Sequence, residues 1–312
     1  MRLAPDRPGS ERCMTSPPPA SSGISDHRRG VLWMLLAMFL FTGMDACAKT
    51  LIQTYPVVQV VWARYFFHVL ILAVVLAPRL RGLMRTERLG LQLMRSLLLL
   101  LTTGLFFSGL QFVPLANASA IMLTSPIVVT ALAIPLLKEC VGPRRWMGVM
   151  AGCLGAAVII RPGSEFMQLA SLFTLGAACT YALYQISTRF LSQSDPVLTT
   201  LLYSASIGAL VTSAVVPFFW VTPAPADWLL FILLGLLGGI GHFAMIKSLT
   251  VAPAAVVVPF TYSNMIWATL YGFILFAELP DMWTVAGAVI IVGSGLYIFH
   301  REQRQDPGVQ SQ

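Results

Sequence analysis

The chain has 312 residues, of which 57% are hydrophobic and 11% are charged, and its formal net charge is +7. A soluble globular protein carries about 25% charged residues, so the composition excludes an ordinary water-soluble domain. The apolar residues form blocks of about 20, the length that a helix needs to cross the hydrocarbon core. Because only helices satisfy their own backbone in lipid at that length, we predict an all-α membrane protein without a nucleic-acid partner.

In chain order, residues 1–29 are rich in Pro, Ser and Arg and lack apolar periodicity, which predicts a disordered cytoplasmic tail. A second cytoplasmic tail is expected at 301–312. Between them the apolar blocks predict ten membrane spans at 31–51, 57–77, 91–112, 116–137, 146–161, 167–188, 196–217, 228–249, 254–276 and 284–300.

The first span also resembles a secretory signal, because Arg28 and Arg29 precede an apolar stretch that ends in Ala46-Cys47-Ala48. Cleavage there would delete one member of the internal repeat described below. We therefore keep this segment as a membrane span.

Basic residues are distributed unequally between the predicted loops. With a cytoplasmic N-terminus, the outer loops contain only Lys49 and Arg161. Cytoplasmic loops of membrane proteins retain Lys and Arg, so both termini are predicted to be cytoplasmic. A nine-span chain would weaken this asymmetry. The basic residues on the cytoplasmic side are Arg28, Arg29, Arg79, Arg81, Arg85, Arg88, Lys138, Arg144, Arg145, Arg189, Lys247, Arg301 and Arg304.

The sequence repeats weakly at an offset of about 139 residues. The halves are predicted at 30–161 and 167–300, each with five spans. An odd number of spans makes the second half enter the membrane from the opposite side, as in the inverted repeats of secondary transporters. The matched pairs are Pro114 with Pro253, Glu139 with Glu278, Gly148 with Gly287 and, one residue further apart, Pro56 with Pro196.

One stretch in the first half carries a family resemblance. Ala118 to Glu139 (ASAIMLTSPIVVTALAIPLLKE), followed by Arg145-Trp146-Met147-Gly148 and by Ile160-Arg161-Pro162-Gly163, resembles the EamA repeat of the drug/metabolite transporter (DMT) superfamily. A more divergent copy begins at Ala254. The resemblance implies ten helices in two inverted EamA repeats, a bacterial cell inner membrane and transport without ATP hydrolysis.

The sequence agrees that the chain is not an ATPase or a membrane enzyme, because it has no phosphate loop, H-E-x-x-H or G-x-S-x-G motif. Its five cysteines form no metal-binding pattern, so no metal or cofactor is expected.

Four ionisable residues lie deep in the predicted spans: Asp45, Arg64, His68 and His242. Such groups are costly in a membrane and favour a functional site. We expect Asp45 and Arg64 to face a central cavity, as an ion pair or as separate contacts to a polar ligand, although a purely structural pair is an equal alternative. His68 lies one turn from Arg64 and would extend the polar face or carry a coupling proton. His242 follows glycines that allow close helix packing.

Aromatic and amide groups complete the predicted substrate site. Tyr181, Tyr184 and Gln185 share one helix face that suits a planar ring. Pro126 and Pro259 fall inside spans and predict helix breaks or kinks. Glu139 and Glu278 lie at helix ends and are interpreted as loop anchors rather than ligands. The remaining candidates for the site are Tyr65, Tyr262, Asn264 and Trp267.

The prediction is a secondary transporter that moves a small organic metabolite by alternating access. The segments 59–68 and 181–189 are similar to a proteobacterial branch that includes riboflavin-type importers. Exporters of amino acids or metallophores and S-adenosylmethionine importers share the architecture and stay open as alternatives, as does a non-transporting scaffold. The expected partners are the substrate and the lipid bilayer, whereas transport direction, coupling ion and oligomeric state are not predicted.

Overall fold

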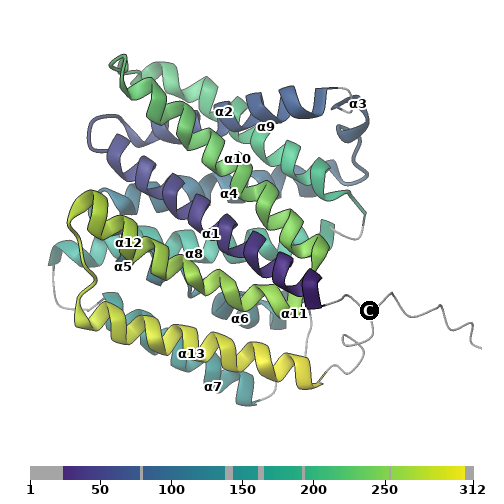
Figure 1. The fold of residues 1–312 in the computed structure, drawn as a ribbon, viewed down its shortest axis with the longest axis vertical. Coiled ribbons are helices and arrows are strands. Elements are labelled where there is room, and N and C mark those ends of the chain that lie inside the picture. The colour runs from purple at the N-terminus through teal and green to yellow at the C-terminus, as the bar shows by residue number, and fades with distance from the viewer. Residues whose placement is uncertain are drawn as a thin grey trace, which may run out of the picture.

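The computed structural model describes residues 24–77, 80–137, 143–160, 165–191, 194–252 and 254–305, and every regular element within these ranges is a helix (Figure 1). The first half contains α1 (Ile24–Leu51), α2 (Val57–Leu76), α3 (Leu80–Leu83), α4 (Leu89–Leu110), α5 (Leu115–Met122), α6 (Ser125–Leu137) and α7 (Pro143–Ile160). The second half contains α8 (Glu165–Leu191), α9 (Val197–Val215), the 3-10 helix η2 (Val216–Phe219), α10 (Asp227–Val251), α11 (Ala254–Val257), the 3-10 helix η3 (Val258–Ser263), α12 (Asn264–Phe276) and α13 (Met282–Gln305).

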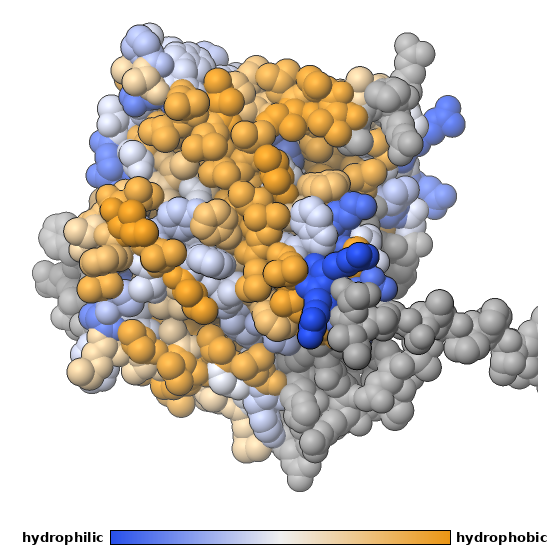
Figure 2. All heavy atoms as spheres, viewed as in Figure 1, coloured by the Kyte–Doolittle hydropathy of each residue, from blue (hydrophilic) through white to orange (hydrophobic). Residues whose placement is uncertain are grey.

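The chain is a multi-pass membrane protein. Among the described residues, 6 helical segments are long and apolar enough to cross a bilayer, and shorter apolar helices accompany them. Large apolar side chains such as Val74 and Leu210 are each 73% exposed, which a soluble monomer rarely tolerates over a wide area. Figure 2 shows hydrophobic residues across most of one face, with hydrophilic residues gathered near the N-terminal end of α1. This apolar exterior suits contact with lipid tails.

Helices of the two halves interlock. The most extensive helix contacts are α1 with α10, α4 with α8 and α7 with α13, and each joins one helix from each half. In Figure 1, α7 and α13 lie together at one edge, and α2 and α9 lie at the opposite edge. In the predicted inverted repeat, α8 is the counterpart of α1 and α4 is the counterpart of α10, which makes the first two contacts equivalent.

Close helix packing depends on small residues, as predicted for the run 235–241. A Cβ atom added to Gly235 in α10 would lie 2.3 Å from the Cβ of Phe67 and 2.9 Å from the backbone nitrogen of His68 in α2. Any side chain there would push α2 and α10 apart. The prediction of close approach is confirmed at this position.

Proline interrupts two of the membrane segments, as the sequence predicts. The α5 and α6 helices separate immediately before Pro126, and Pro259 lies within η3, between α11 and α12. Proline lacks a backbone donor and its ring clashes with the preceding turn, which breaks the α-helical ladder. At the first break, the carbonyl of Ile121 accepts from the backbone nitrogen of Thr124 at 3.0 Å and from its hydroxyl at 2.7 Å.

The helices extend beyond the predicted apolar spans. Residues 24–29, expected in the N-terminal tail, form the first turns of α1, and α13 continues to Gln305. A helix that emerges from lipid can continue in water when local pairs support it, and Asp26 and Arg29 lie 3.7 Å apart at i and i+3. The rest of the predicted tails, at 1–23 and 306–312, lies outside the described residues, as do Glu139 and Arg161.

Candidate functional site

A small polar pocket lies inside the helix bundle between both halves. Helices α2 and α4 of the first half and α8, α9 and α10 of the second half supply its walls. Its volume is about 10 Å³, which accommodates about one water molecule. The lining residues are Arg64, Tyr65, His68, Leu99, Tyr184, Leu201, Ser204, Ala205 and His242. The structure thus holds five of the predicted site residues around one closed cavity.

Arg64 is anchored on one side of this pocket by α4. Its Nη1 donates to Oγ1 of Thr103, and the hydroxyl of Tyr65 lies 2.9 Å from the same oxygen. The guanidinium lies over the rings of Tyr65 and Phe107, with its central carbon 5.4 Å and 5.8 Å from the ring centroids. Aromatic faces attract a cation and partly compensate its removal from water.

Arg95 of α4 is a second deep cation, and the sequence analysis did not identify it. The residue is only 4% exposed. Its Nη2 donates to the hydroxyl of Tyr184 at 2.7 Å, and its guanidinium lies 4.4 Å from the centroid of the same ring. The Nε donates to Oγ1 of Thr188 at 2.7 Å, and Nη1 donates to Oγ of Ser204 at 2.6 Å and to the carbonyl of Thr200 at 3.0 Å. Arg95 therefore fixes Tyr184 at the pocket wall.

The sequence of α4 contains a pattern that indicates that Arg95 points into the protein. Gln92, Ser96 and Thr103 share a helix face with it, and all are buried. Because Arg95 lies near the start of the helix, it looks in sequence like a side chain that reaches back to the membrane surface. A polar stripe that runs from Gln92 to Thr103, about three turns, argues instead for an inward orientation.

Two histidines face each other across the pocket. The rings of His68 in α2 and His242 in α10 have centroids 5.5 Å apart. Nδ1 of His242 lies 2.8 Å from the carbonyl oxygen of Gly238, which selects the tautomer with a proton on Nδ1. Nε2 of His68 is buried and has no hydrogen-bond partner within the described parts of the chain.

The predicted aromatic face of α8 is also present. The rings of Tyr181 and Tyr184 stack with centroids 5.5 Å apart and an interplanar angle of 17°. Tyr184 lines the pocket, and Tyr181 lies behind it. Gln185 is half-buried beside them on the same helix.

Four predicted residues lie away from this pocket. Asp45 is half-buried in α1, and Arg64 is the charge that acts on it, but the two do not form an ion pair within 4.0 Å. Tyr262 directs its hydroxyl against Gly295 of α13. Trp267 packs edge-on against Phe39 of α1 at 5.2 Å, and Asn264 is the first residue of α12. A substrate role for these four residues stays a prediction.

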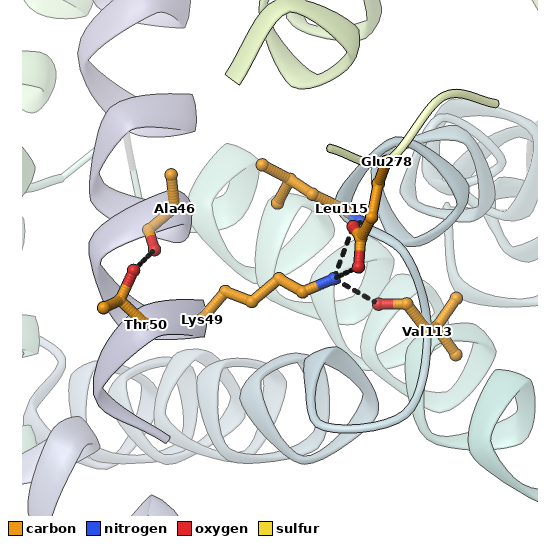
Figure 3. Close-up of polar contacts among 6 residues, drawn as sticks. All are labelled: Ala46, Lys49, Thr50, Val113, Leu115 and Glu278. Carbon is orange, nitrogen blue, oxygen red and sulfur yellow. Dashed lines mark hydrogen bonds and ion pairs between the residues drawn. The ribbon is translucent and has the colours of Figure 1, made fainter. Parts of the chain in front are cut away.

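A partly buried ion pair joins the two halves at one end of α1 (Figure 3). The ammonium of Lys49, at the end of α1, lies 2.6 Å and 2.7 Å from the two carboxylate oxygens of Glu278 in the loop between α12 and α13. Lys49 also donates to the carbonyl of Val113 at 3.2 Å, and the backbone nitrogen of Leu115 donates to Glu278 at 3.2 Å. The prediction that Glu278 anchors a loop is confirmed. Lys49, interpreted only as an orientation signal, proves to be its partner.

Two residues at equivalent positions of the two halves, Tyr55 and Asp195, form further hydrogen bonds between the halves. Tyr55, directly before the proline that opens α2, donates to Oδ2 of Asp227 at 2.6 Å at the start of α10. Asp195, directly before the proline that opens α9, accepts hydrogen bonds from Thr86 and, at 2.8 Å, from Nε2 of Gln92 in α4. Each tie therefore connects one half of the chain to the other.

Comparison with known proteins identifies relatives over nearly the whole chain. The model of the EamA-like transporter family matches twice, at residues 28–161 and 168–299. The S-adenosylmethionine uptake transporter of Rickettsia prowazekii is 25% identical and covers 91% of this chain and 97% of its own length. The riboflavin transporter of Vibrio cholerae is 29% identical, with 89% and 95% covered. The pseudopaline exporter of Pseudomonas aeruginosa is 25% identical, with 85% and 94% covered.

A solved crystal structure agrees in fold alone. It matches with a TM-score of 0.60 at 16% identity and covers 89% of this chain and 98% of its own. The relatives named for uptake or export are members of the DMT superfamily, as the resemblance implied. The chain belongs to the EamA-like transporter family of that superfamily.

Proposed function

We propose that this transporter is a secondary carrier that moves a small organic metabolite with a planar ring across the bacterial inner membrane by alternating access. The observation that carries the proposal is that Tyr184 and Arg64 line the same pocket, and that Tyr184 is held there by its stack with Tyr181 and by Arg95. Aromatic faces bind flat rings, and guanidinium groups bind their polar edges or substituents. Both halves of the chain contribute to this wall, as expected for a carrier whose halves move around a central site.

The topology that we propose has ten spans in two inverted halves and cytoplasmic termini. The start of α1 and the end of α13 lie on the same side of the bundle in Figure 1, which supports an even number of crossings. The excess of Lys and Arg in the loops predicted on that side supports a cytoplasmic location. Cysteine labelling at residue 87 and at residue 223 tests this arrangement, because the proposal places these loops on opposite sides of the membrane.

Two substrates are the first candidates. Riboflavin and S-adenosylmethionine, named for the relatives, each contain a flat nitrogen heterocycle, and the sequence resemblance favours a riboflavin-like vitamin. The pocket is closed to little more than the size of a water molecule, so either substrate requires the helices around it to separate. Movement of helices around a fixed site is what alternating access requires.

Counterflow in proteoliposomes tests the proposal. Vesicles loaded with unlabelled riboflavin or S-adenosylmethionine should accumulate the matching labelled compound without ATP. Tyr184→Ala should reduce the rate of accumulation, whereas Leu210→Ala, at a side chain exposed on α9, should not. A chain that binds a compound but shows no counterflow would be a receptor or scaffold rather than a carrier. Reversing the substrate and pH gradients separately would show direction and whether a proton is coupled.

A further inference from the structure

We propose that the pocket recognises an anionic group of the transported molecule, a carboxylate or a phosphate, through Arg64 and His68. This inference rests on the proposed carrier function and specifies its substrate class. It follows from the charge balance around the pocket, from the hydrogen-bond donors left over there and from the position of those donors on one helix.

The pocket region has an excess of positive charge. The ion pairs in the described parts of the chain are Arg29 with Asp26 and Lys49 with Glu278, and neither involves Arg64 or Arg95. All four groups that accept hydrogen bonds from Arg95 are uncharged. Asp45 balances at most one of the two guanidinium groups.

The excess charge is costly in this location. A charge within the hydrocarbon part of a membrane helix is unfavourable unless it is paired or hydrated. None of the lining residues is Asp or Glu. A bound anion would supply the missing counter-charge where hydration is weakest.

The two arginines differ in the donors that they leave available. Nε, Nη1 and Nη2 of Arg95 all have partners, so its role is to hold Tyr184 and the surrounding helices. Arg64 donates from Nη1 to Thr103. A guanidinium has five N–H groups in a planar fork, so further donors of Arg64 are available to a ligand. Arg64 also lines the pocket, so it is the arginine that can bind a carboxylate or phosphate through two parallel hydrogen bonds.

His68 supplies a second, independent indication of a ligand. The residue is 5% exposed, it lines the same pocket, and its Nε2 has no hydrogen-bond partner among the residues that the structure describes. An unsatisfied polar atom buried in this way costs free energy, and such groups are rare unless water or a ligand completes them. His68 follows Arg64 by four residues, so both project from one face of α2.

The closed pocket explains how the resting state tolerates this arrangement. A volume of about 10 Å³ holds about one water molecule, which can accept from Arg64 and, when the neutral imidazole carries its proton on Nε2, from His68. A carboxylate displaces that water and offers two charged acceptor oxygens. Since the pocket must widen to admit it, anion binding and helix separation are coupled.

Matched ligand pairs test the inference on the purified full-length protein. FMN differs from riboflavin by a phosphate, AMP differs from adenosine by a phosphate, and S-adenosylmethionine differs from its decarboxylated form by a carboxylate. Dissociation constants from calorimetry should be at least tenfold lower for the anionic member of a pair whose ring fits. In Arg64→Gln this preference should disappear, and in His68→Leu it should fall several-fold.

Two further variants guard against loss of fold. Arg64→Lys keeps the positive charge but not the planar fork of donors, so it should retain part of the preference for the anionic ligand. His68→Gln keeps a hydrogen-bond donor, so its preference for the anionic ligand should be greater than that of His68→Leu. Affinities are compared only for variants whose unfolding temperature and elution volume match those of the parent protein. Equal affinity for both members of every pair, or no binding of any anionic member, overturns the inference. Counterflow of riboflavin without preference for FMN would overturn it while leaving the carrier function intact.

Discussion

Lys49 and Glu278 are separated by 229 positions in the sequence, yet their side chains form an ion pair at the same edge of the bundle (Figure 3). The pair joins the end of α1, in the first half, to the loop before α13, in the second half. Val113 and Leu115, between α4 and α5, contribute backbone groups to the same cluster. Separating the Glu278 loop from the first half therefore breaks three charge-assisted hydrogen bonds, two from Lys49 and one from Leu115.

Lys49→Met should destabilise the protein by about 1–3 kcal/mol. Removing one partner of a buried ion pair costs about 3–5 kcal/mol, but the Glu278 side chain is 30% exposed and water compensates part of the loss. Thermal unfolding in detergent measures the change. In the double variant with Glu278→Gln the loss should be smaller than the sum of the single losses. Strict additivity would show that the two side chains do not depend on each other.

Asp195 should make stability depend on pH in the acid range. Burial raises the pKa of its carboxyl, but hydrogen bonds from Thr86, Gln92 and the backbone of Glu87, together with the charge of Arg88, outweigh burial and lower the pKa below its ordinary value. A lowered folded pKa means that the carboxylate stabilises the fold above the unfolded pKa of about 3.9 and loses this effect as the pH falls through the folded value.

Asp195→Asn should therefore lower the unfolding temperature at pH 7, and the difference from the parent should shrink as the pH falls below about 4. Asn keeps the shape of the side chain, so the comparison isolates its charge. Thermal unfolding in detergent from pH 7 to pH 3 measures it. A difference that stays constant over this range would exclude the carboxylate charge as the cause.

Gly235→Ala should destabilise the contact between α2 and α10. The new methyl group would lie 2.3 Å from the Cβ of Phe67 and close to the backbone of His68, so the helices must shift. Inserting a methylene into a packed interior costs about 1–3 kcal/mol. Because His68 lies at this contact, the transport rate should fall as well.

Gly104→Ala is the matched control for this substitution. Its added Cβ meets nothing within 4 Å, although it also lies in a long helix, α4. Ala is a better helix former than Gly by about 0.5–1 kcal/mol, so stability should stay equal or rise slightly. Equal losses of stability in the two variants would show that helix propensity, not close packing, explains Gly235.

Several features of this fold follow from local patterns in the sequence. Apolar blocks, glycine spacing and the prolines at 126 and 259 determine where helices form, approach and break, and these predictions agree with the structure. The spacing of Tyr181 and Tyr184 places both on one face of α8 in the same way. These signals depend on residues that are close in sequence, so they can be interpreted without tertiary structure.

Features that depend on distant partners were not accessible in this way. Lys49 looked like a loop cation because its partner lies in the other half, and Arg95 looked like a side chain that reaches the membrane surface. The predicted inverted repeat indicates that the halves are related but not which helices contact each other. Only the structure shows that α1 packs against α10 and that α8 packs against α4.

Arg95→Lys should reduce the transport rate more than it reduces stability. A lysine ammonium is one compact group and cannot contact Tyr184, Ser204 and Thr188 together as the planar guanidinium does. The ring of Tyr184 would then lose its fixed position at the pocket wall. We expect about a tenfold loss in uptake rate, which corresponds to about 1.4 kcal/mol.

Tyr184→Phe separates the hydrogen bond of that tyrosine from its ring. It removes only the hydroxyl that accepts from Arg95 at 2.7 Å, and a hydrogen bond to a charged group contributes about 1.5–3 kcal/mol. The ring and its stack with Tyr181 remain, so substrate affinity should fall less than in Tyr184→Ala. Tyr297→Phe, at a side chain 44% exposed on α13, controls for the loss of a hydroxyl and should transport normally. If Tyr184→Phe and Arg95→Lys both kept the parental affinity and rate, Arg95 would serve helix packing alone, since its contact with Tyr184 would have no effect on the substrate.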